Sequence, residues 1–165
     1  METIAKHRKK LLEPYTQSSA AADIVASAKH LAHLVLASDR LLHRHKKKML
    51  SEVLWLISEA DGKYSTRYRS VEVVRLAQCE PTSTARIQHE HVFPRKRVTE
   101  SILRDRERLL ADPALLDTIL EQTVGCVVTV DEHKALCDHE DGWRRYSNVP
   151  VLDMATSPPS IIHVS

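Results

Sequence analysis

The chain has 165 residues, of which 42% are hydrophobic and 28% charged, and its formal net charge is +2. This composition is typical of a folded protein and excludes a disordered chain, and the length suits one compact domain, with or without a helical appendage. No apolar run approaches the roughly 20 residues that span a bilayer, and the first residues lack a signal-peptide pattern. We therefore expect a cytoplasmic protein without membrane contact. Its three widely spaced cysteines argue against a disulfide framework.

The first third of the chain is predicted to be helical. Residues 3–12 form a short basic helix that Pro14 stops, and an Ala-rich helix follows Ser18 and runs to about residue 37. A third helix is expected from Ser38 to Gly62. It carries the run 43–48, which is either a solvated charged face or a surface that contacts phosphate.

Residues 62–69 interleave tyrosines with basic residues after a turn. Such a segment can contact a nucleic-acid backbone and stack on bases, or it can be a connector whose tyrosines pack on the core. The next segment, 70–78, is ambiguous: Ser70 could cap a helix, whereas three valines favour a strand.

Two strands separated by helices follow. Residues 84–92 are predicted to form a strand that Pro94 ends, and helices are expected to about residue 110 and from Pro113 to residue 122. Residues 124–128 form the clearest strand, because they are apolar and rich in valine. Thr129 and Glu132 then match the Thr-x-x-Glu capping box, so His133 falls in the first turn of a helix.

The strongest candidates for chemistry are His89, Glu90 and His91, at the end of the strand over 84–92. Phosphodiester hydrolysis needs a base that takes a proton from water and an ion that neutralises charge on the phosphate. A neutral imidazole suits the first role. In a regular strand His89 and His91 point to one face and Glu90 to the other. A twisted strand end would bring Glu90 and His91 to one ion, with His89 as a reserve ligand.

The segments Glu90–Pro94 and Cys126–His133 resemble the His-Asn-His (HNH), or ββα-metal, nuclease superfamily. The resemblance implies that His91 is the general base and that Glu90 and His133 hold one divalent ion. It also implies that Arg95 and Lys96 lie near the phosphate. Magnesium or manganese is the preferred ion, and zinc or nickel is also acceptable to such ligands.

The implied fold is α+β, with a helical N-terminal region over 1–66, a ββα-metal core over 67–153 and a C-terminal tail over 154–165. Because Glu90 and His133 are 43 positions apart (133 − 90), the core must contain a helical insertion between its two strands. The implied activity is that of a metal-dependent endonuclease, a hydrolase that cuts DNA or, second in preference, RNA.

Further candidate contacts to nucleic acid are basic residues and one tyrosine spread along the chain. They are Lys46, Lys47, Lys48, Lys63, Tyr64, Arg67, Arg69, Lys96, Arg144 and Arg145. The N-terminal helices could also join two copies into a homodimer, in which paired nicking sites would cut both strands.

Three alternatives remain open on the sequence. Cys126, His133, Cys137 and His139 could form a structural zinc site, although their spacing is not that of a zinc finger. The chain could bind nucleic acid or regulate a partner with the same fold and no catalysis. It could also act through its N-terminal helices as an interaction protein, for example a phage or host-defence component.

Overall fold

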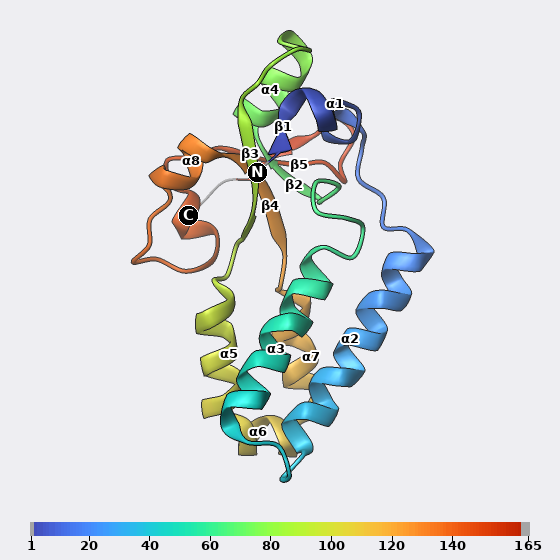
Figure 1. Cartoon of the computed structure of the whole chain (residues 1–165), viewed down its shortest axis with the longest axis vertical. Helices are drawn as coiled ribbons and strands as arrows, with labels where there is room; N and C mark the ends of the chain where they lie inside the picture. The colour runs from blue at the N-terminus through green and yellow to red at the C-terminus, as the bar shows by residue number, and fades with distance from the viewer. Residues whose placement is uncertain (1, 163–165) are drawn as a thin grey trace.

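The computed structural model describes residues 2–162, in which a six-stranded sheet lies above a layer of helices (Figure 1). The strand order is β1-β3-β4-β2-β5-β6, and the antiparallel pair β3–β4 contributes the two longest strands. β4 pairs in parallel with β2. The strands are β1 (Glu2–Thr3), β2 (Tyr68–Ser70), β3 (Arg86–His91), β4 (Gly125–Thr129), β5 (Val151–Asp153) and β6 (Ser160–Ile161).

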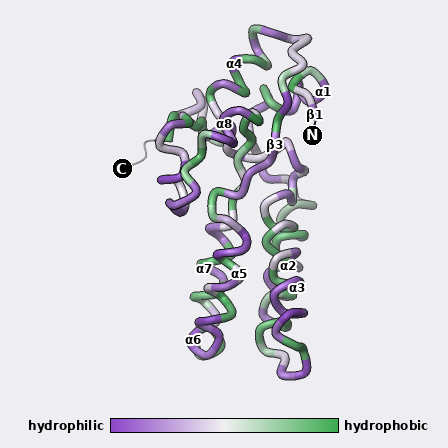
Figure 2. The backbone as a smooth tube through the Cα atoms, turned by 60° about the vertical axis from the view of Figure 1, so that its left-hand side comes forward, coloured by the Kyte–Doolittle hydropathy of each residue, from purple (hydrophilic) through white to green (hydrophobic). Residues whose placement is uncertain are grey.

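The helical layer is built from two separate parts of the chain. α2 (Ser19–Ala37) and α3 (His43–Ser58) come before the central strands, whereas α5 (Arg95–Arg104), α6 (Arg106–Ala111) and α7 (Pro113–Glu121) lie between β3 and β4. Hydrophobic and hydrophilic residues alternate along these helices (Figure 2). Their apolar sides form one core, which includes Leu36, Leu50, Leu54, Ile102 and Leu120.

The two faces of the sheet carry different cores. α1 (Ile4–Leu12) and α4 (Val71–Cys79) pack with Ile87 and Val127 on one face. On the other, Cys126 and Val128 pack near α8 (Val130–Ala135) and the 3-10 helix η1 (Gly142–Tyr146). The alternation of side chains along β3 and β4 produces this division.

The mixed α and β fold and the helices between the two central strands agree with the sequence prediction. Ser18 caps α2, and Thr129 and Glu132 form the predicted capping box. The third helix begins at His43, not Ser38, and the helix predicted to residue 110 breaks at Asp105.

Two further segments differ from a simple reading of the sequence. The ambiguous segment 70–78 is helical, because Ser70 ends β2 and its hydroxyl accepts from the Val73 N–H and caps α4. The first residues join the sheet, because β1 pairs with β3. α2 is long and apolar enough to cross a membrane by length and composition alone, but it packs against α3 and α7.

Candidate functional site

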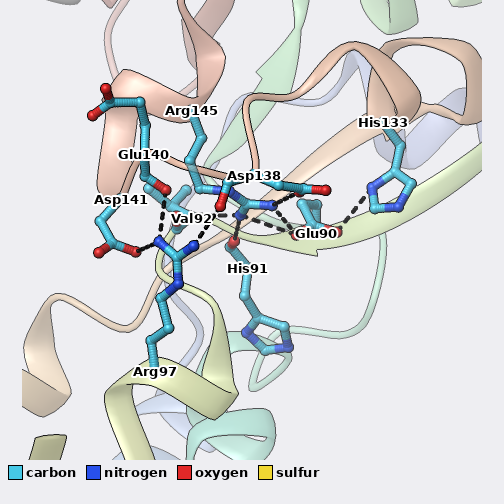
Figure 3. A network of polar contacts seen from close by, with 9 residues as sticks. All are labelled: Glu90, His91, Val92, Arg97, His133, Asp138, Glu140, Asp141 and Arg145. Atoms are coloured by element: carbon cyan, nitrogen blue, oxygen red, sulfur yellow. Dashed lines mark hydrogen bonds and ion pairs between the residues drawn. The ribbon is translucent and has the colours of Figure 1, made fainter.

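The strand β3 directs neighbouring members of the triplet to opposite faces of the sheet. Its register with β4 is regular from Ile87 to His91. His89 and His91 are buried on the face that contacts α3, and Glu90 points toward α8 and η1. Figure 3 shows the His91 ring directed away from the Glu90 carboxylate. The strand therefore keeps its regular alternation, and its end is not twisted enough to bring Glu90 and His91 together.

Glu90 is held between a buried arginine and a histidine (Figure 3). Both terminal nitrogens of Arg145 donate to Glu90 Oε1, each at 3.1 Å. The other carboxylate oxygen, Oε2, lies 3.1 Å from His133 Nδ1. The Glu90 side chain is 14% exposed and that of His133 is 37% exposed, whereas the His133 Nδ1 atom that faces Glu90 is buried. The structure thus brings together the two residues predicted to share an ion.

The start of α8 places His133 beside Glu90. Thr129 Oγ1 accepts from the Glu132 N–H, and Glu132 Oε2 accepts in return from the Thr129 N–H. The same Glu132 oxygen accepts from the Ser70 hydroxyl at 2.6 Å, which ties the first turn to β2. The capping box and the Ser70 hydrogen bond fix the first turn of this short helix, which carries His133.

Arg145 is positioned by the loop before η1. Its Nη1 also donates to the His91 carbonyl oxygen at 2.8 Å. Arg97 of α5 holds the loop before η1. It donates to the carbonyl oxygens of Asp138 and Glu140 and to the Asp141 carboxylate. The sequence suggested Arg145 only as a contact to nucleic acid. The separation of 55 residues between Arg145 and Glu90 left no local signal for their pairing.

On the opposite face, His89 and His91 form an aromatic cluster with Trp55 of α3. The ring centroid of Trp55 lies 6.0 Å from that of His89 and 5.5 Å from that of His91. Glu59 Oε1 approaches His89 Nδ1 to 3.0 Å without the alignment of a hydrogen bond. The His89 ring also lies against Gly125, where an added Cβ would be 1.8 Å from Nε2. Glycine at this position therefore makes room for the ring.

Burial keeps both of these histidines uncharged. Loss of hydration, with smaller effects from the nearby cations Lys63 and Arg95, lowers the pKa of His89 to about 4. Burial likewise lowers the pKa of His91 to about 3, with smaller effects from His89 and Arg95. Burial also raises the pKa of Glu59, whose Oε1 lies 3.0 Å from His89 Nδ1.

The spacing of Glu90 Oε2 and His133 Nδ1 suits two ligands of one divalent ion. Two ligand atoms at right angles, each about 2.1 Å from an ion, are about 3.0 Å apart, close to the separation of Oε2 and Nδ1. His133 Nδ1 is also a buried nitrogen without a hydrogen-bond partner in the described chain. Within residues 2–162 no group of three or more His, Cys, Asp and Glu side chains could hold a metal. Water and phosphate would therefore supply the other ligands, as is usual for magnesium.

The same finding bears on the alternative zinc site. Cys126 is fully buried inside β4, and it is not gathered with His133, Cys137 and His139 into a group of metal ligands. Burial raises the pKa of the Cys126 thiol well above its ordinary value, which disfavours the thiolate that zinc binds.

The predicted contacts to nucleic acid divide into buried and accessible residues. Lys46, Tyr64, Arg69 and Arg145 are buried, and Arg69 donates to the carbonyl oxygens of Leu11 and Glu13. These four residues serve the interior of the protein. The accessible ones are Lys47, Lys48, Lys63, Arg67, Lys96 and Arg144, although Arg67 is paired with Asp153 and Lys47 with Glu100. Arg95 lies on the α3 side, where its guanidinium is 4.4 Å from the Trp55 ring centroid.

Comparisons of the chain with protein-family models, with curated proteins and with solved structures gave no match. The arrangement of β3, β4 and α8 and the contacts of Glu90 must therefore carry the argument about function.

Proposed function

We propose that the chain is a metal-dependent endonuclease that hydrolyses phosphodiester bonds of DNA, with Glu90 and His133 as the two protein ligands of one divalent ion. The observation that carries the proposal is the 3.1 Å separation of Glu90 Oε2 and His133 Nδ1 across β3 and α8. The order strand, antiparallel strand, helix is that of the ββα-metal nucleases that the sequence resembles.

Each neighbour of the pair has a definite task in this proposal. Arg145 holds Glu90 Oε1 with two hydrogen bonds, which leaves Oε2 free to face the ion and His133. The capping box holds α8 so that the His133 ring meets that oxygen. A divalent ion bound there would supply positive charge to the phosphate and to the leaving oxygen. The His133 side chain is 37% exposed, so its outer edge lies at the surface beside the proposed ion.

Activation of water by His91 is a separate part of the proposal. Both ring nitrogens of His91 are enclosed and lack hydrogen-bond partners among the described residues. Its lowered pKa, about 3, is also far from the value near working pH that suits a general base. The geometry therefore supports the ion ligands and gives no contact between His91 and the ion site. A variant of His91 has to be tested independently of the ligand variants.

The decisive experiment measures nicking of supercoiled plasmid with magnesium, manganese, zinc or nickel. His133→Ala should abolish nicking, and isothermal titration should show loss of metal binding without DNA present. His139→Ala, which changes an exposed histidine of the following loop, is the matched control and should behave like the original chain. His133→Ala is preferable to a Glu90 variant, because removal of Glu90 would leave the buried Arg145 without the carboxylate that accepts from both of its terminal nitrogens.

The outcomes separate the parts of the proposal. If the original chain nicks with none of the metals, or if His133→Ala nicks as well as the control, the endonuclease proposal fails. Loss of nicking in His91→Ala with metal binding retained would support His91 as the base. Binding of DNA without any nicking would favour the second candidate, a non-catalytic nucleic-acid-binding protein. The contact of Arg145 with Glu90 is the observation that favours this candidate, because it already satisfies one oxygen of the carboxylate.

A further inference from the structure

A groove between α3 and α5 is lined by five cationic side chains. Its volume is about 410 Å³, and the cations are Arg44, Lys47 and Lys48 from α3 and Arg95 and Lys96 from α5. The two helices lie side by side, because residues 47 and 51 of α3 contact residues 100 and 95 of α5, respectively. The groove thus lies in the helical layer, outside the strands and the helix that hold Glu90 and His133.

The positive charge of the groove exceeds its negative charge. Glu52 lines the groove and Glu100 pairs with Lys47 at 2.8 Å, so two carboxylates face five cations. Over residues 2–162, Arg44, Lys48 and Lys96 have no carboxylate within 4.0 Å. Concentrated charge of one sign in a concave surface attracts anions of the other sign. The groove is therefore complementary to a polyanion.

A buried hydroxyl in the same groove lacks a partner. Thr99 of α5 lines the groove and is only 1% exposed, and its Oγ1 makes no hydrogen bond within the described chain. Unpaired buried polar groups are uncommon in folded proteins. The hydrogen of a threonine hydroxyl rotates to suit an acceptor, so it can turn toward a ligand in the groove. An anionic oxygen in the groove would give this donor an acceptor.

The lining also indicates which polyanion fits. Arg44 and Ser51 are seven residues apart on α3, a rise of roughly 10 Å, so the groove is long enough to meet more than one phosphate of a backbone. None of the lining residues is aromatic, so the groove offers no ring on which an unpaired base could stack. The Trp55 ring of α3 lies outside the lining and is covered by the Arg95 guanidinium, 4.4 Å from its centroid.

We propose that the groove between α3 and α5 binds the sugar-phosphate backbone of duplex DNA, with Arg44, Lys48 and Lys96 on the phosphates and the Thr99 hydroxyl as a further donor. The choice of DNA rests on the proposed endonuclease function, whereas the binding of a phosphate backbone rests on the groove alone. α5 begins four residues after β3 ends, so DNA held here passes close to the strand that carries Glu90.

The test is binding of a fluorescein-labelled duplex, followed by fluorescence anisotropy in EDTA so that no cleavage occurs. Lys48→Glu and Lys96→Glu should each weaken binding about tenfold or more, and each should reduce the slope of log K against log salt by about 1. Thr99→Val should weaken binding a few-fold with an unchanged slope. Lys10→Glu is the matched control, because Lys10 is an exposed cation of α1, on the sheet side of the molecule (Figure 1).

Equal losses in Lys10→Glu and Lys96→Glu, or an unchanged salt slope in both groove variants, would overturn the proposal. Tighter binding of single-stranded DNA or of duplex RNA than of duplex DNA would overturn the assignment of the ligand. His133→Ala distinguishes this proposal from the catalytic one. If that variant and the original chain bind DNA equally and neither nicks it, the groove stands and the endonuclease proposal falls. If nicking depends on His133 and the groove variants bind DNA normally, the endonuclease proposal stands and the groove proposal falls.

Discussion

The buried histidines of β3 should make the folded protein sensitive to acid. His89 and His91 lie side by side with ring centroids 5.2 Å apart, and burial lowers the pKa of His89 to about 4 and that of His91 to about 3. In an unfolded chain a histidine titrates near 6.5. The unfolded state therefore binds protons first as the pH falls. Stability that is fully present above about pH 6.5 is lost progressively as the pH falls toward the two folded values.

The size of the effect follows from these pKa values. Near pH 5 almost every unfolded histidine is protonated, whereas His89 and His91 remain largely neutral in the folded state. The difference corresponds to about 2 kcal/mol for each ring, or about 4 kcal/mol together. Lys63 lies near His89, and Arg95 lies near both rings, so these cations oppose protonation of the pair. Such a loss is a large part of the roughly 5–15 kcal/mol that stabilises a typical protein.

Urea unfolding at about pH 7.5 and about pH 5 measures this loss directly. The original chain should lose about 4 kcal/mol between the two conditions, and His91→Gln should lose only about 2 kcal/mol, because one of the two rings is gone. His30→Gln, which replaces an exposed histidine of α2, is the control and should keep the full loss. Equal losses in the original chain and in His91→Gln would refute the argument that these buried rings carry the acid sensitivity.

Three further changes test other parts of the structure. Gly125→Ala would place a Cβ 1.8 Å from His89 Nε2, so the free energy of unfolding in urea should fall by about 1–3 kcal/mol. Thr129→Ala removes the cap of α8 and should cost about 1 kcal/mol in the same assay, whereas a smaller cost than for an exposed threonine elsewhere would contradict the capping role. If the N-terminal helices form a homodimer, light scattering should give twice the 18.7 kDa chain mass. Leu31→Glu with Leu34→Glu, on the exposed side of α2, should then restore the monomer.

Local signals in the sequence predicted the helix starts and the central strands. Ser18, Pro113 and the pair Thr129 and Glu132 each act within three or four residues of the chain, so the sequence alone reveals them. The strand over 124–128 was equally clear, because its apolar run is buried on both faces. β2 has three residues and β1 has two, which is too short for the alternation of a strand to show.

The candidate site was harder to predict because its contacts join distant parts of the chain. The closeness of Glu90 and His133 followed from the family resemblance, and the structure brings these two side chains together. The pairing of Arg145 with Glu90 and the contact of Trp55 with His91 depend on how η1 and α3 pack on the sheet. Periodicity within one segment carries no information about such packing.

The regular strand β3 explains how one short motif supports two surfaces. Because side chains alternate, Glu90 joins α8 and η1 on one face while His89 joins α3 through Trp55 and Glu59 on the other. β3 is therefore fixed from both sides, and it continues through Pro94 into α5, whose first residues line the basic groove. The distance between the groove and the Glu90–His133 pair is consequently set by a short, well-packed stretch of chain.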